Sequence, residues 1–597
     1  MERKDKNKGK LDEKFEFDWE KEYNEVKSEY KGVKPGDDKE LAREEARAER
    51  ERARIARAEA KAQKEKARAE KEKFRSDRET LRAERERARL EREEAEAKRA
   101  GSGQDKTSGS SDVEKRRKGK RNIETNVIAF IFVGIFAVMI IYFINFQQST
   151  ATEMAQSPLN PRNTTVAPPD PVRRGSIYAA DGSVLAVTKL NDEGKEYRSY
   201  PMGALFSTPV GMERGGGSGI EGKLNDELLT SSHDTLVEVK SSDVDENHKE
   251  YQGNSLYTTL IPELQQTAYD ALGDNKGAVL AIEPSTGKIL CMVSKPTYDP
   301  NKGSTDYDEW AALPAEDSVL INRATQGQYP PGSTFKIFTA IEYMKENPDR
   351  YNNFRFNCEG TTWPKGGAKI SCQYHTAHGN EDITKSFVVS CNCAFSTIGL
   401  ELDKEKYKQT AEEFGFNAKL PIDDIESFES RFFINKDSSM SEVQETAFGQ
   451  GNTMITPLQN LMITATVANG GTMMKPYLVD KVEAADGTVV KQKAPIVFRS
   501  DLLSEKESGA VTELMHQMVS QSLGGVFRSA YKVAGKTGQA EYENDIDKAH
   551  LWFTCFAPYD DPQIAVICVL EKNEIDPYKA PKVCREVVYD YINNYYW

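Results

Sequence analysis

The chain turns at Pro330-Pro331-Gly332-Ser333-Thr334-Phe335-Lys336 and continues into an apolar-periodic segment, residues 337–344. Two prolines and a glycine end whatever precedes them, so this stretch predicts a helix whose first turn carries Ser333, with Lys336 one turn later on the same face. A serine hydroxyl is a poor nucleophile at neutral pH, and a neighbouring lysine that loses its charge on desolvation can accept its proton. The stretch therefore predicts a serine nucleophile beside its own general base.

The Ser-x-x-Lys pattern alone is weak evidence, because it also occurs from Ser28 to Lys31 and from Ser529 to Lys532, where no helix-start signal precedes it. Two further motifs follow in the chain and raise its specificity. They are Ser390-Cys391-Asn392 and Lys536-Thr537-Gly538-Gln539. Ser-x-x-Lys, Ser-x-Asn and Lys-Thr-Gly in this order are the motif set of penicillin-binding proteins and serine β-lactamases.

From about Thr258 to its end, the chain resembles the transpeptidase domain of a class B penicillin-binding protein. Further stretches that match this family are Gly277-Ala278-Val279-Leu280-Ala281-Ile282-Glu283-Pro284, Gly449-Gln450-Gly451 and Thr456-Pro457-Leu458-Gln459. The resemblance implies an α+β penicillin-binding transpeptidase fold, in which a five-stranded antiparallel sheet is flanked by helices and joined to a mostly helical subdomain. It also implies acyl transfer on peptidoglycan stem peptides and inhibition by β-lactam antibiotics.

Each motif residue takes a role from this resemblance. Ser333 attacks the D-Ala-D-Ala carbonyl, Lys336 accepts its proton, and Ser390 passes that proton toward the departing amine. Asn392 binds substrate backbone and Lys336, while the neighbouring Cys391 is interpreted as a packing residue. The substrate-binding residues on the last motif are Lys536 and Thr537 for the terminal carboxylate, Gly538 for close approach of the peptide, and Gln539, whose backbone N–H joins that of Ser333 in an oxyanion hole.

The acceptor of the acyl group decides the net reaction. An amine of a neighbouring stem peptide gives a cross-link, whereas water gives D,D-carboxypeptidase activity. Membrane anchoring and a pedestal favour the cross-linking transpeptidase. The alternatives are a transmembrane β-lactam sensor or a non-catalytic cell-wall scaffold, but no cytoplasmic protease or kinase signature precedes Arg121 and none of the motif residues is missing.

The composition changes along the 597 residues, which predicts several modules. Residues 1–38 form a polar segment. Residues 39–100 consist almost entirely of Ala, Glu, Arg and Lys, with opposite charges three positions apart, and predict a solvated helix roughly 90 Å long. Its large apolar residues do not recur in a sustained heptad pattern, so we prefer a single helix to a coiled coil. It is interpreted either as a partner-binding arm or spacer or as a charged rod without a specific partner.

Residues 101–121 are a Gly/Ser linker and a basic flank, and residues 122–146 contain an uncharged apolar run of about the 20 residues that cross a bilayer. The basic cluster from Lys115 to Arg121 predicts a single-pass plasma-membrane protein with its N-terminus in the cytoplasm and its catalytic part on the outer face. A proline-rich linker, residues 147–170, follows.

Residues 171–256 are predicted to form a small β-rich pedestal, and residues 257–597 the transpeptidase domain. An Asp-Gly turn at residues 181–182 predicts a hairpin, and the surrounding Arg174-Gly175 and the segment 218–224 resemble the class B pedestal. In the transpeptidase domain, the strands are predicted at residues 278–282, 288–293, 532–541, 551–556 and 563–571, with helices at Leu260–Leu272 and from Pro581 onward. Residues 307–524 are predicted to be a mostly helical insertion.

All eight cysteines lie at or after Cys291. Cys358 and Cys372 are placed to form a disulfide or to remain free thiols. Together with His375 and His378 they suggest a zinc site, but the spacing is irregular and we expect neither a metal nor a cofactor.

A net charge of −14 and the lack of a basic, aromatic-rich surface argue against nucleic acid as a partner. The resemblance instead implies a polytopic glycosyltransferase and other cell-wall proteins as partners, in cell-shape maintenance, cell division or sporulation.

Overall fold

The computed structural model describes residues 172–213, 218–231, 251–542 and 545–596, together with Gly134, Phe136, Met139 and Ile140. The predicted segments 1–38, 39–100, 101–121 and 147–170 lie outside the described residues. Of the predicted membrane segment only the four named residues are described, and all four are helical. Among the described helices none is both long enough and apolar enough to cross a membrane. Contacts divide the chain into two units, 1–150 and 151–597, and the second is described below.

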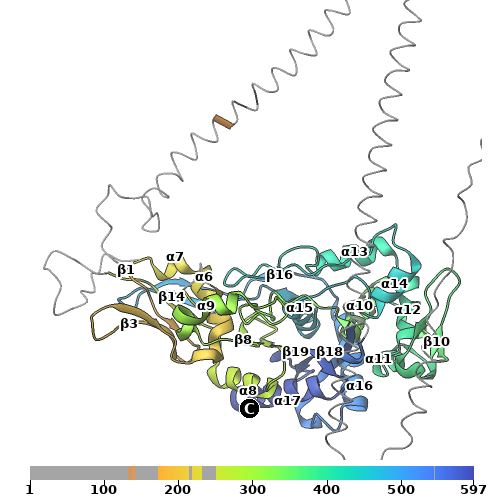
Figure 1. Ribbon diagram of the computed structural model, residues 1–597. Coiled ribbons are helices and arrows are strands. Elements are labelled where there is room, and N and C mark those ends of the chain that lie inside the picture. The colour runs from red at the N-terminus through yellow and green to blue at the C-terminus, as the bar shows by residue number, and fades with distance from the viewer. Residues whose placement is uncertain are drawn as a thin grey trace, which may run out of the picture. The chain divides into compact units, whose positions relative to one another are not determined.

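A five-stranded antiparallel sheet forms the centre of this unit, as predicted (Figure 1). It joins both ends of the transpeptidase part of the chain. In spatial order its strands are β17 (Ala534–Tyr542), β18 (Asp545–Ala557), β19 (Ile564–Glu574), β7 (Gly277–Ile282) and β8 (Ile289–Lys295). β18 begins at Asp545 rather than at residue 551, because its pairing with β17 continues to the hairpin turn, where Tyr542 faces Asp545.

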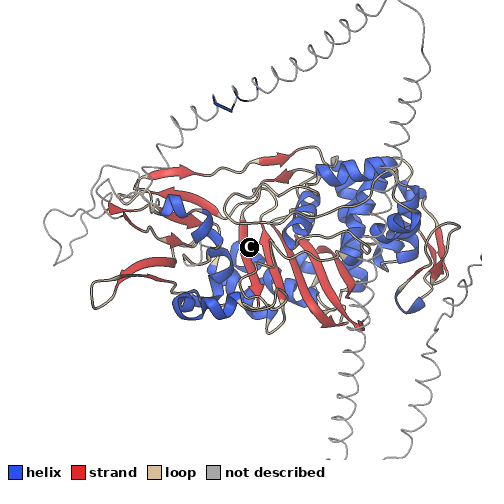
Figure 2. Ribbon diagram, turned by 45° about the horizontal axis from the view of Figure 1, so that its top comes forward, coloured by secondary structure: helices blue, strands red, loops and turns tan. Residues whose placement is uncertain are grey.

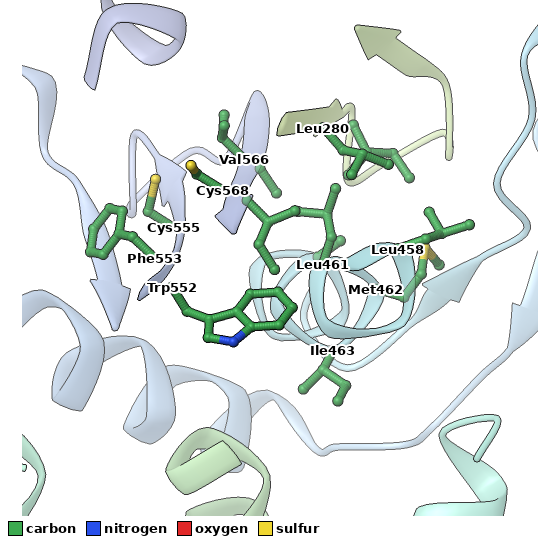
Figure 3. Close-up of a cluster of buried hydrophobic side chains, with 14 of the residues drawn as sticks. Leu280, Leu458, Leu461, Met462, Ile463, Trp552, Phe553, Cys555, Val566 and Cys568 are labelled. Carbon is green, nitrogen blue, oxygen red and sulfur yellow. The ribbon is translucent and has the colours of Figure 1, made fainter. Parts of the chain in front are cut away.

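Helices cover the sheet. α15 (Pro457–Ala468) packs on β7, β18 and β19, while α8 (Pro262–Leu272) and α17 (Lys579–Tyr591) pack on each other and on the sheet. Strands covered in this way become continuous apolar runs, and every residue of β7 is buried. Figure 3 shows part of the resulting core, in which Leu458 and Leu461 of α15 lie beside Leu280 and Val566 of the sheet.

The insertion between β8 and β17 contains the other described helices of the transpeptidase domain, most of them gathered beside the sheet (Figure 2). They are α9 (Gly303–Ala311), α10 (Lys336–Glu346), α11 (Ile383–Val388), α12 (Asn392–Glu401), α13 (Lys404–Glu413), α14 (Met440–Ala447), α15 and α16 (Glu505–Ser522). Shorter turns within the described chain are η1 (Gly203–Phe206), η2 (Pro300–Lys302), η3 (Gly332–Phe335), η4 (Tyr351–Asn353), η5 (Gln373–His375), η6 (Ser529–Tyr531) and η7 (Ile592–Tyr596).

This insertion also contains strands that the sequence did not indicate. They are β9 (Phe356–Cys358), β10 (Thr361–Thr362), β11 (Ile370–Ser371), β12 (Gly379–Glu381), β13 (Met473–Met474), β14 (Val479–Glu483), β15 (Val489–Gln492) and β16 (Val497–Arg499). Most span two to four residues, too few to produce a period-two pattern in the sequence, so they form through tertiary pairing instead.

The pedestal is built on a six-stranded sheet. Its strands, in spatial order, are β15, β14, β6 (Ser255–Thr258), β2 (Ile177–Tyr178), β3 (Val184–Leu190) and β4 (Glu196–Ser199). The predicted hairpin is present as β2 and β3. β14 and β15 come from much later in the sequence, within the transpeptidase part of the chain, so this sheet does not end at residue 256. Its neighbours are β1 (Val172–Arg173), β5 (Tyr251–Gln252), α5 (Ser207–Val210), α6 (Gly219–Lys223) and α7 (Asn225–Leu228).

A buried carboxylate joins the two pedestal stretches singled out in the sequence. Oε2 of Glu221 accepts a hydrogen bond from Nε of Arg174 at 2.6 Å, and Oε1 accepts one from Nε of Arg198 at 2.7 Å. The Glu221 side chain is fully buried, so its charge is held by two guanidinium groups. Arg174 and Glu221 therefore fix the hairpin against α6.

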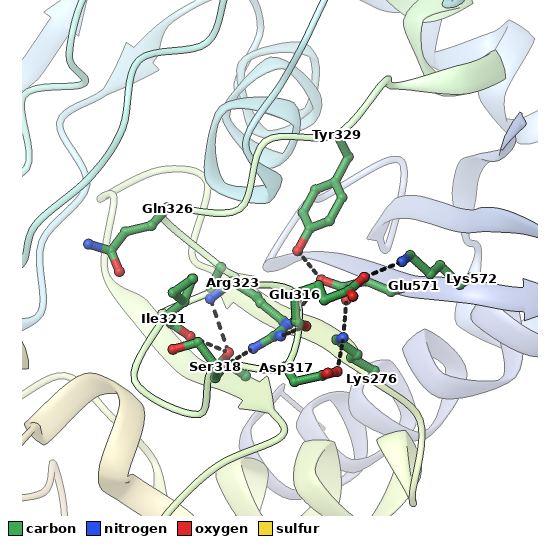
Figure 4. A network of polar contacts seen from close by, with 12 residues as sticks. Lys276, Glu316, Asp317, Ser318, Ile321, Arg323, Gln326, Tyr329, Glu571 and Lys572 are labelled. Carbon is green, nitrogen blue, oxygen red and sulfur yellow. Dashed lines mark hydrogen bonds and ion pairs between the residues drawn. The ribbon is translucent and has the colours of Figure 1, made fainter. Parts of the chain in front are cut away.

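A second buried network fixes the segment that leads into Pro330 (Figure 4). Oε1 of Glu571, on β19, accepts hydrogen bonds from Nε of Arg323 at 2.9 Å and from Oη of Tyr329 at 2.6 Å. The Arg323 guanidinium also donates to the carbonyls of Ser318 and Glu316. The central sheet thereby positions the chain immediately before the Ser-x-x-Lys turn.

Candidate active site

Ser333 lies in the 3-10 turn η3, and Lys336 is the first residue of α10. The sequence predicted one continuous helix, but the tighter turn matters for the site, because side chains three positions apart align in a 3-10 turn. Nζ of Lys336 is 3.0 Å from Oγ of Ser333. Ser333 is half-buried and Lys336 is fully buried. The predicted pairing of a hydroxyl with an amine is therefore present.

Two glycines allow the turn to pack against the rest of the domain. Gly332 has φ +55°, and its N–H donates to the carbonyl of Gly449 at 2.9 Å. Gly449 has φ +89°, and a Cβ there would lie 1.8 Å from the carbonyl oxygen of Gly332. The Gly-Gln-Gly stretch is thus a support for the nucleophile turn. Asn460 adds a hydrogen bond of 2.9 Å to Oγ1 of Thr334.

Ser390 precedes α12 and has φ +56°, a left-handed conformation that is uncommon for a residue with a side chain. Its hydroxyl lies between two amines, 3.1 Å from Nζ of Lys336 and 3.0 Å from Nζ of Lys536. Its carbonyl accepts a hydrogen bond from Lys336 at 2.6 Å. Oδ1 of Asn392 accepts another from Lys336 at 2.7 Å, and its Nδ2 donates to the carbonyl of Ser371 at 3.2 Å.

Burial acts on both lysines. It lowers the pKa of Lys336 from its ordinary 10.5 to about 8, and it lowers the pKa of Lys536 well below the same value, with the charge of Lys336 adding to the effect. Both pKa values fall because desolvation disfavours the charged form of an amine. A neutral Lys336 can accept a proton from Ser333 near neutral pH.

Lys536 lies on β17, which is an edge strand of the central sheet. Gly538, two residues on, packs against the nucleophile turn: a Cβ there would lie 2.9 Å from Cγ2 of Thr334. Thr537 and Gln539 are half-buried, and Oε1 of Gln539 accepts a hydrogen bond from Nε2 of Gln373 at 3.1 Å. Because one edge of β17 pairs with β18, its other edge is available to an added strand.

The structure thus brings Ser333, Lys336, Ser390, Asn392 and Lys536 into one hydrogen-bonded cluster. Thr537, Gly538 and Gln539 lie on the strand beside it. The sequence did not indicate three of the supporting residues: Phe395, whose ring centroid is 5.6 Å from Nζ of Lys336, Phe387, 5.4 Å from Nζ of Lys536, and Gln373. Phe387 and Phe395 carry only an apolar-core pattern, so no sequence signal could have assigned them to the site.

Comparison with known proteins agrees with this geometry. The family described as penicillin binding protein transpeptidase domain matches residues 277–592. The peptidoglycan D,D-transpeptidase PbpA of Mycolicibacterium smegmatis is 31% identical over 459 residues, which cover 73% of this chain and 92% of that protein. The protein of the same name from Mycobacterium tuberculosis is 30% identical over 468 residues, covering 74% and 93%.

Solved structures give the same result. The crystal structure of M. tuberculosis penicillin-binding protein A aligns with a TM-score of 0.62 at 28% identity, covering 70% of this chain and 98% of that one. The D,D-transpeptidase domain of a peptidoglycan glycosyltransferase from Eggerthella lenta aligns with a TM-score of 0.62 at 30% identity, covering 71% and 98%. This chain therefore belongs to the penicillin-binding protein transpeptidase family, as a class B member.

Proposed function

We propose that this chain is a membrane-anchored peptidoglycan D,D-transpeptidase that cross-links stem peptides through an acyl-enzyme on Ser333 and is a target of β-lactams. The observation that carries the proposal is the contact between Nζ of Lys336 and Oγ of Ser333 at 3.0 Å, with the Ser390 hydroxyl held between Lys336 and Lys536. A nucleophile, its base and a proton carrier are thereby within reach of one another.

In the first half-reaction Oγ of Ser333 attacks the carbonyl carbon between the two D-Ala residues, and its proton moves to Nζ of Lys336. The backbone N–H groups of Ser333 and Gln539 stabilise the oxyanion that forms. The tetrahedral intermediate then expels the terminal D-Ala, whose amine takes a proton that Lys336 passes through the Ser390 hydroxyl. An ester between Ser333 and the shortened stem peptide remains.

In the second half-reaction an amine of a neighbouring stem peptide attacks the ester carbonyl. The same residues work in reverse: the amine loses its proton through Ser390 to Lys336, and Ser333 regains its proton as the new peptide bond forms. Water at the same position would instead release a free carboxylate, which is the carboxypeptidase reaction.

Substrate binding uses β17. Lys536 and the Thr537 hydroxyl hold the terminal carboxylate of the stem peptide, and the peptide runs along the free edge of the strand beyond Gly538. Asn392 orients both the substrate backbone and the amine of Lys336. The side chain of Gln539, which is bonded to Gln373, lies at the position from which it can contact the bound peptide.

The apolar run within residues 122–146 and the basic cluster before it support a single membrane anchor, with residues 1–121 in the cytoplasm and the catalytic domain on the outer face. Cross-linking acts on newly made glycan strands, which a glycosyltransferase supplies. A polytopic glycosyltransferase is therefore the partner that we propose, with the pedestal and the charged segment 39–100 as candidate contact regions.

The test is transfer from a stem pentapeptide ending in D-Ala-D-Ala to an added D-amino acid, followed by mass spectrometry. The parent chain is expected to release D-Ala and to form the exchange product, and Ser333→Ala is expected to form none. Ser529→Ala, in an exposed copy of the same Ser-x-x-Lys pattern, is the matched control and is expected to behave as the parent. Hydrolysis without exchange would make the chain a carboxypeptidase, and a folded parent that releases no D-Ala would favour the scaffold alternative.

A further inference from the structure

Four side chains beside the active site place their metal-binding atoms together: Cys358, Cys372, His378 and Cys391. These atoms all lie within 4.8 Å of one another. We propose that this cluster binds one Zn²⁺ ion and that the ion holds the Ser390-Cys391-Asn392 turn in its catalytic position. The sequence had suggested a different set that included His375 and had not favoured a metal.

The distances fit a tetrahedral ion. Sulfur ligands about 2.3 Å and a nitrogen ligand about 2.0–2.1 Å from zinc lie roughly 3.5–3.8 Å from one another. The Sγ atoms of Cys358 and Cys372 are 3.7 Å apart, those of Cys372 and Cys391 are 3.6 Å apart, and Sγ of Cys358 is 3.4 Å from Nδ1 of His378. The side chains are thus already spaced as ligands of one ion.

The ligands come from four separate stretches of the chain. Cys358 ends β9 and lies opposite Gly379 of β12, next to His378, while Cys372 follows β11. Cys391 lies at the N-terminus of α12. An ion bound by all four would therefore link a region of two- and three-residue strands to the helix that follows Ser390.

Neighbouring groups favour metal-bound sulfur over a packed apolar cluster. The backbone N–H of Gly360 donates to Sγ of Cys358 at 3.4 Å, and that of Ala394 donates to Sγ of Cys391 at 3.3 Å. Glu381 is 2% exposed, and its Oε1, 3.5 Å from Nδ1 of His378, has no hydrogen-bond partner among the described residues. A buried carboxylate oxygen without a donor is costly, and a nearby cation offsets that cost.

The donor set selects the metal. Three thiols and one imidazole form a Cys₃His site, which is typical of structural zinc, and binding releases the three thiol protons. His378 lies near the surface, with 15% of its side chain exposed, which gives the ion a route of entry. Cys393 has its Sγ 3.6 Å from Sγ of Cys372 but donates to the carbonyl of Ile370, so we assign it no ligand role.

The catalytic consequence rests on the proposed function. Ser390 keeps its left-handed backbone at φ +56° only if its surroundings hold it there. Its neighbour Cys391 would be fixed by the ion on one side, while the Ser390 carbonyl and Oδ1 of Asn392 both accept from Lys336 on the other. The ion makes no contact with substrate: Cys391 is a positioning residue.

Metal content of the purified full-length chain tests the site without any assay of activity. We expect about one equivalent of zinc per chain, and Co²⁺ in its place is expected to give the sulfur-to-cobalt charge-transfer band and intense visible bands of a tetrahedral thiolate site. His378→Ala and Cys358→Ser each remove a ligand and are expected to weaken zinc binding by more than the roughly 10–100-fold that is typical of losing an outer-shell partner. Cys393→Ser is the matched control and should retain the ion.

Three results would overturn the site: a parent chain whose cobalt spectrum lacks thiolate bands, a Cys358–Cys372 disulfide in its place, or loss of zinc from Cys393→Ser as large as that from Cys358→Ser. The cobalt spectrum of the parent needs no variant, so it decides the question even where a variant fails to fold.

The positioning role is tested by chelating the zinc and then adding one equivalent back. The rate of acylation by a fluorescent penicillin is expected to fall on chelation and to recover on addition, as purely structural damage would not. Unchanged acylation after complete removal of zinc would contradict positioning. If the zinc-loaded parent is not acylated at all, the proposed function fails, while the metal content still decides the site.

Discussion

Nζ of Lys536 lies 3.0 Å from Oγ of Ser390, although the two residues come from a sheet strand and from the start of a helix far apart in the sequence. Lys336 reaches the same hydroxyl from its other side. A hydroxyl between two buried amines can accept a hydrogen bond from one and donate to the other, so Ser390 is suited to pass a proton.

Ser390→Ala should slow acylation by about 10²–10⁴-fold, the range typical of a lost proton-transfer group, with little change in melting temperature. The variant removes the shared hydroxyl but leaves Ser333 and Lys336 in place. Stopped-flow measurement of acylation by a fluorescent penicillin checks this expectation. Ser529→Ala is the control, and a variant that is acylated at the parent's rate would exclude a proton-carrying role for Ser390.

The acylation rate should rise with pH by about tenfold per unit until pH 8 and then level off, because only neutral Lys336 can accept the proton of Ser333. The measurement is the rate constant for penicillin acylation between pH 6 and 9.5. A profile that is flat across pH 8 would mean that Lys336 is not the base.

The lowered pKa of Lys336 also affects the stability of the fold. The folded-state pKa of Lys336, about 8, lies below its ordinary value of 10.5, so between these values the unfolded chain binds more protons than the folded one. The contribution of Lys336 to stability should therefore increase as pH rises through this window. Urea unfolding of the parent and of Lys336→Met at pH 7.5 and 9.5 separates this contribution: the parent should gain more stability on this pH change than the variant does.

Gly449→Ala should destabilise the fold and the nucleophile turn together. A Cβ at Gly449 would lie 1.8 Å from the carbonyl oxygen of Gly332, and its φ of +89° costs a residue with a side chain about 1–3 kcal/mol even without that clash. The melting temperature and the rate of acylation by penicillin should both fall. Gly509→Ala is the matched control: it lies within α16, a Cβ there meets nothing within 4 Å, and a gain of about 0.5–1 kcal/mol is expected. Equal melting temperatures for both variants would show that the packing of Gly449 against Gly332 does not stabilise the nucleophile turn.

Arg323→Ala should lower the free energy of unfolding by about 1.5–3 kcal/mol, because the Glu571 carboxylate, whose side chain is 10% exposed, loses its guanidinium partner and keeps only Lys276 and Tyr329. Glu316→Ala removes the exposed pair between Glu316 and Lys572 nearby and should cost at most about 1 kcal/mol. Chemical denaturation of both variants makes the comparison, and similar losses would show that the Arg323 network does not fix the segment before Pro330.

Sequence reasoning was most accurate where the determinants are local. Ser333 and Lys336 are three positions apart at a Pro-Pro-Gly turn, so their contact follows from helical geometry. β7, β8 and β19 contain apolar runs that predict strands close to the observed bounds, whereas β17 is indicated by its Lys-Thr-Gly motif and β18 begins six residues before the predicted residue 551. By contrast, β14 joins the pedestal sheet through pairing with β6, and no local pattern in residues 479–483 indicates so distant a partner.

The candidate site itself was predicted from motifs rather than from geometry. Nothing in the spacing of Ser390 and Lys536 gives their distance, and the left-handed backbone of Ser390 is set by tertiary contacts. The cysteine cluster illustrates the limit further. His375 and His378 are equally plausible ligands in the sequence, but Nδ1 of His378 is beside Cys358, whereas Nδ1 of His375 is 3.5 Å from Oγ1 of Thr361. Cys391 joins the cluster through the packing of α12 beside β9 and β11, which the sequence does not indicate.

The most direct measurement is the location of the covalent adduct. The full-length chain is treated with penicillin and digested, and the modified peptide is identified by mass spectrometry. One penicilloyl group on Ser333, absent from Ser333→Ala and retained in Ser529→Ala, is the predicted result. An adduct on another residue, or a folded parent that carries none, would contradict the acyl-enzyme on which the account rests.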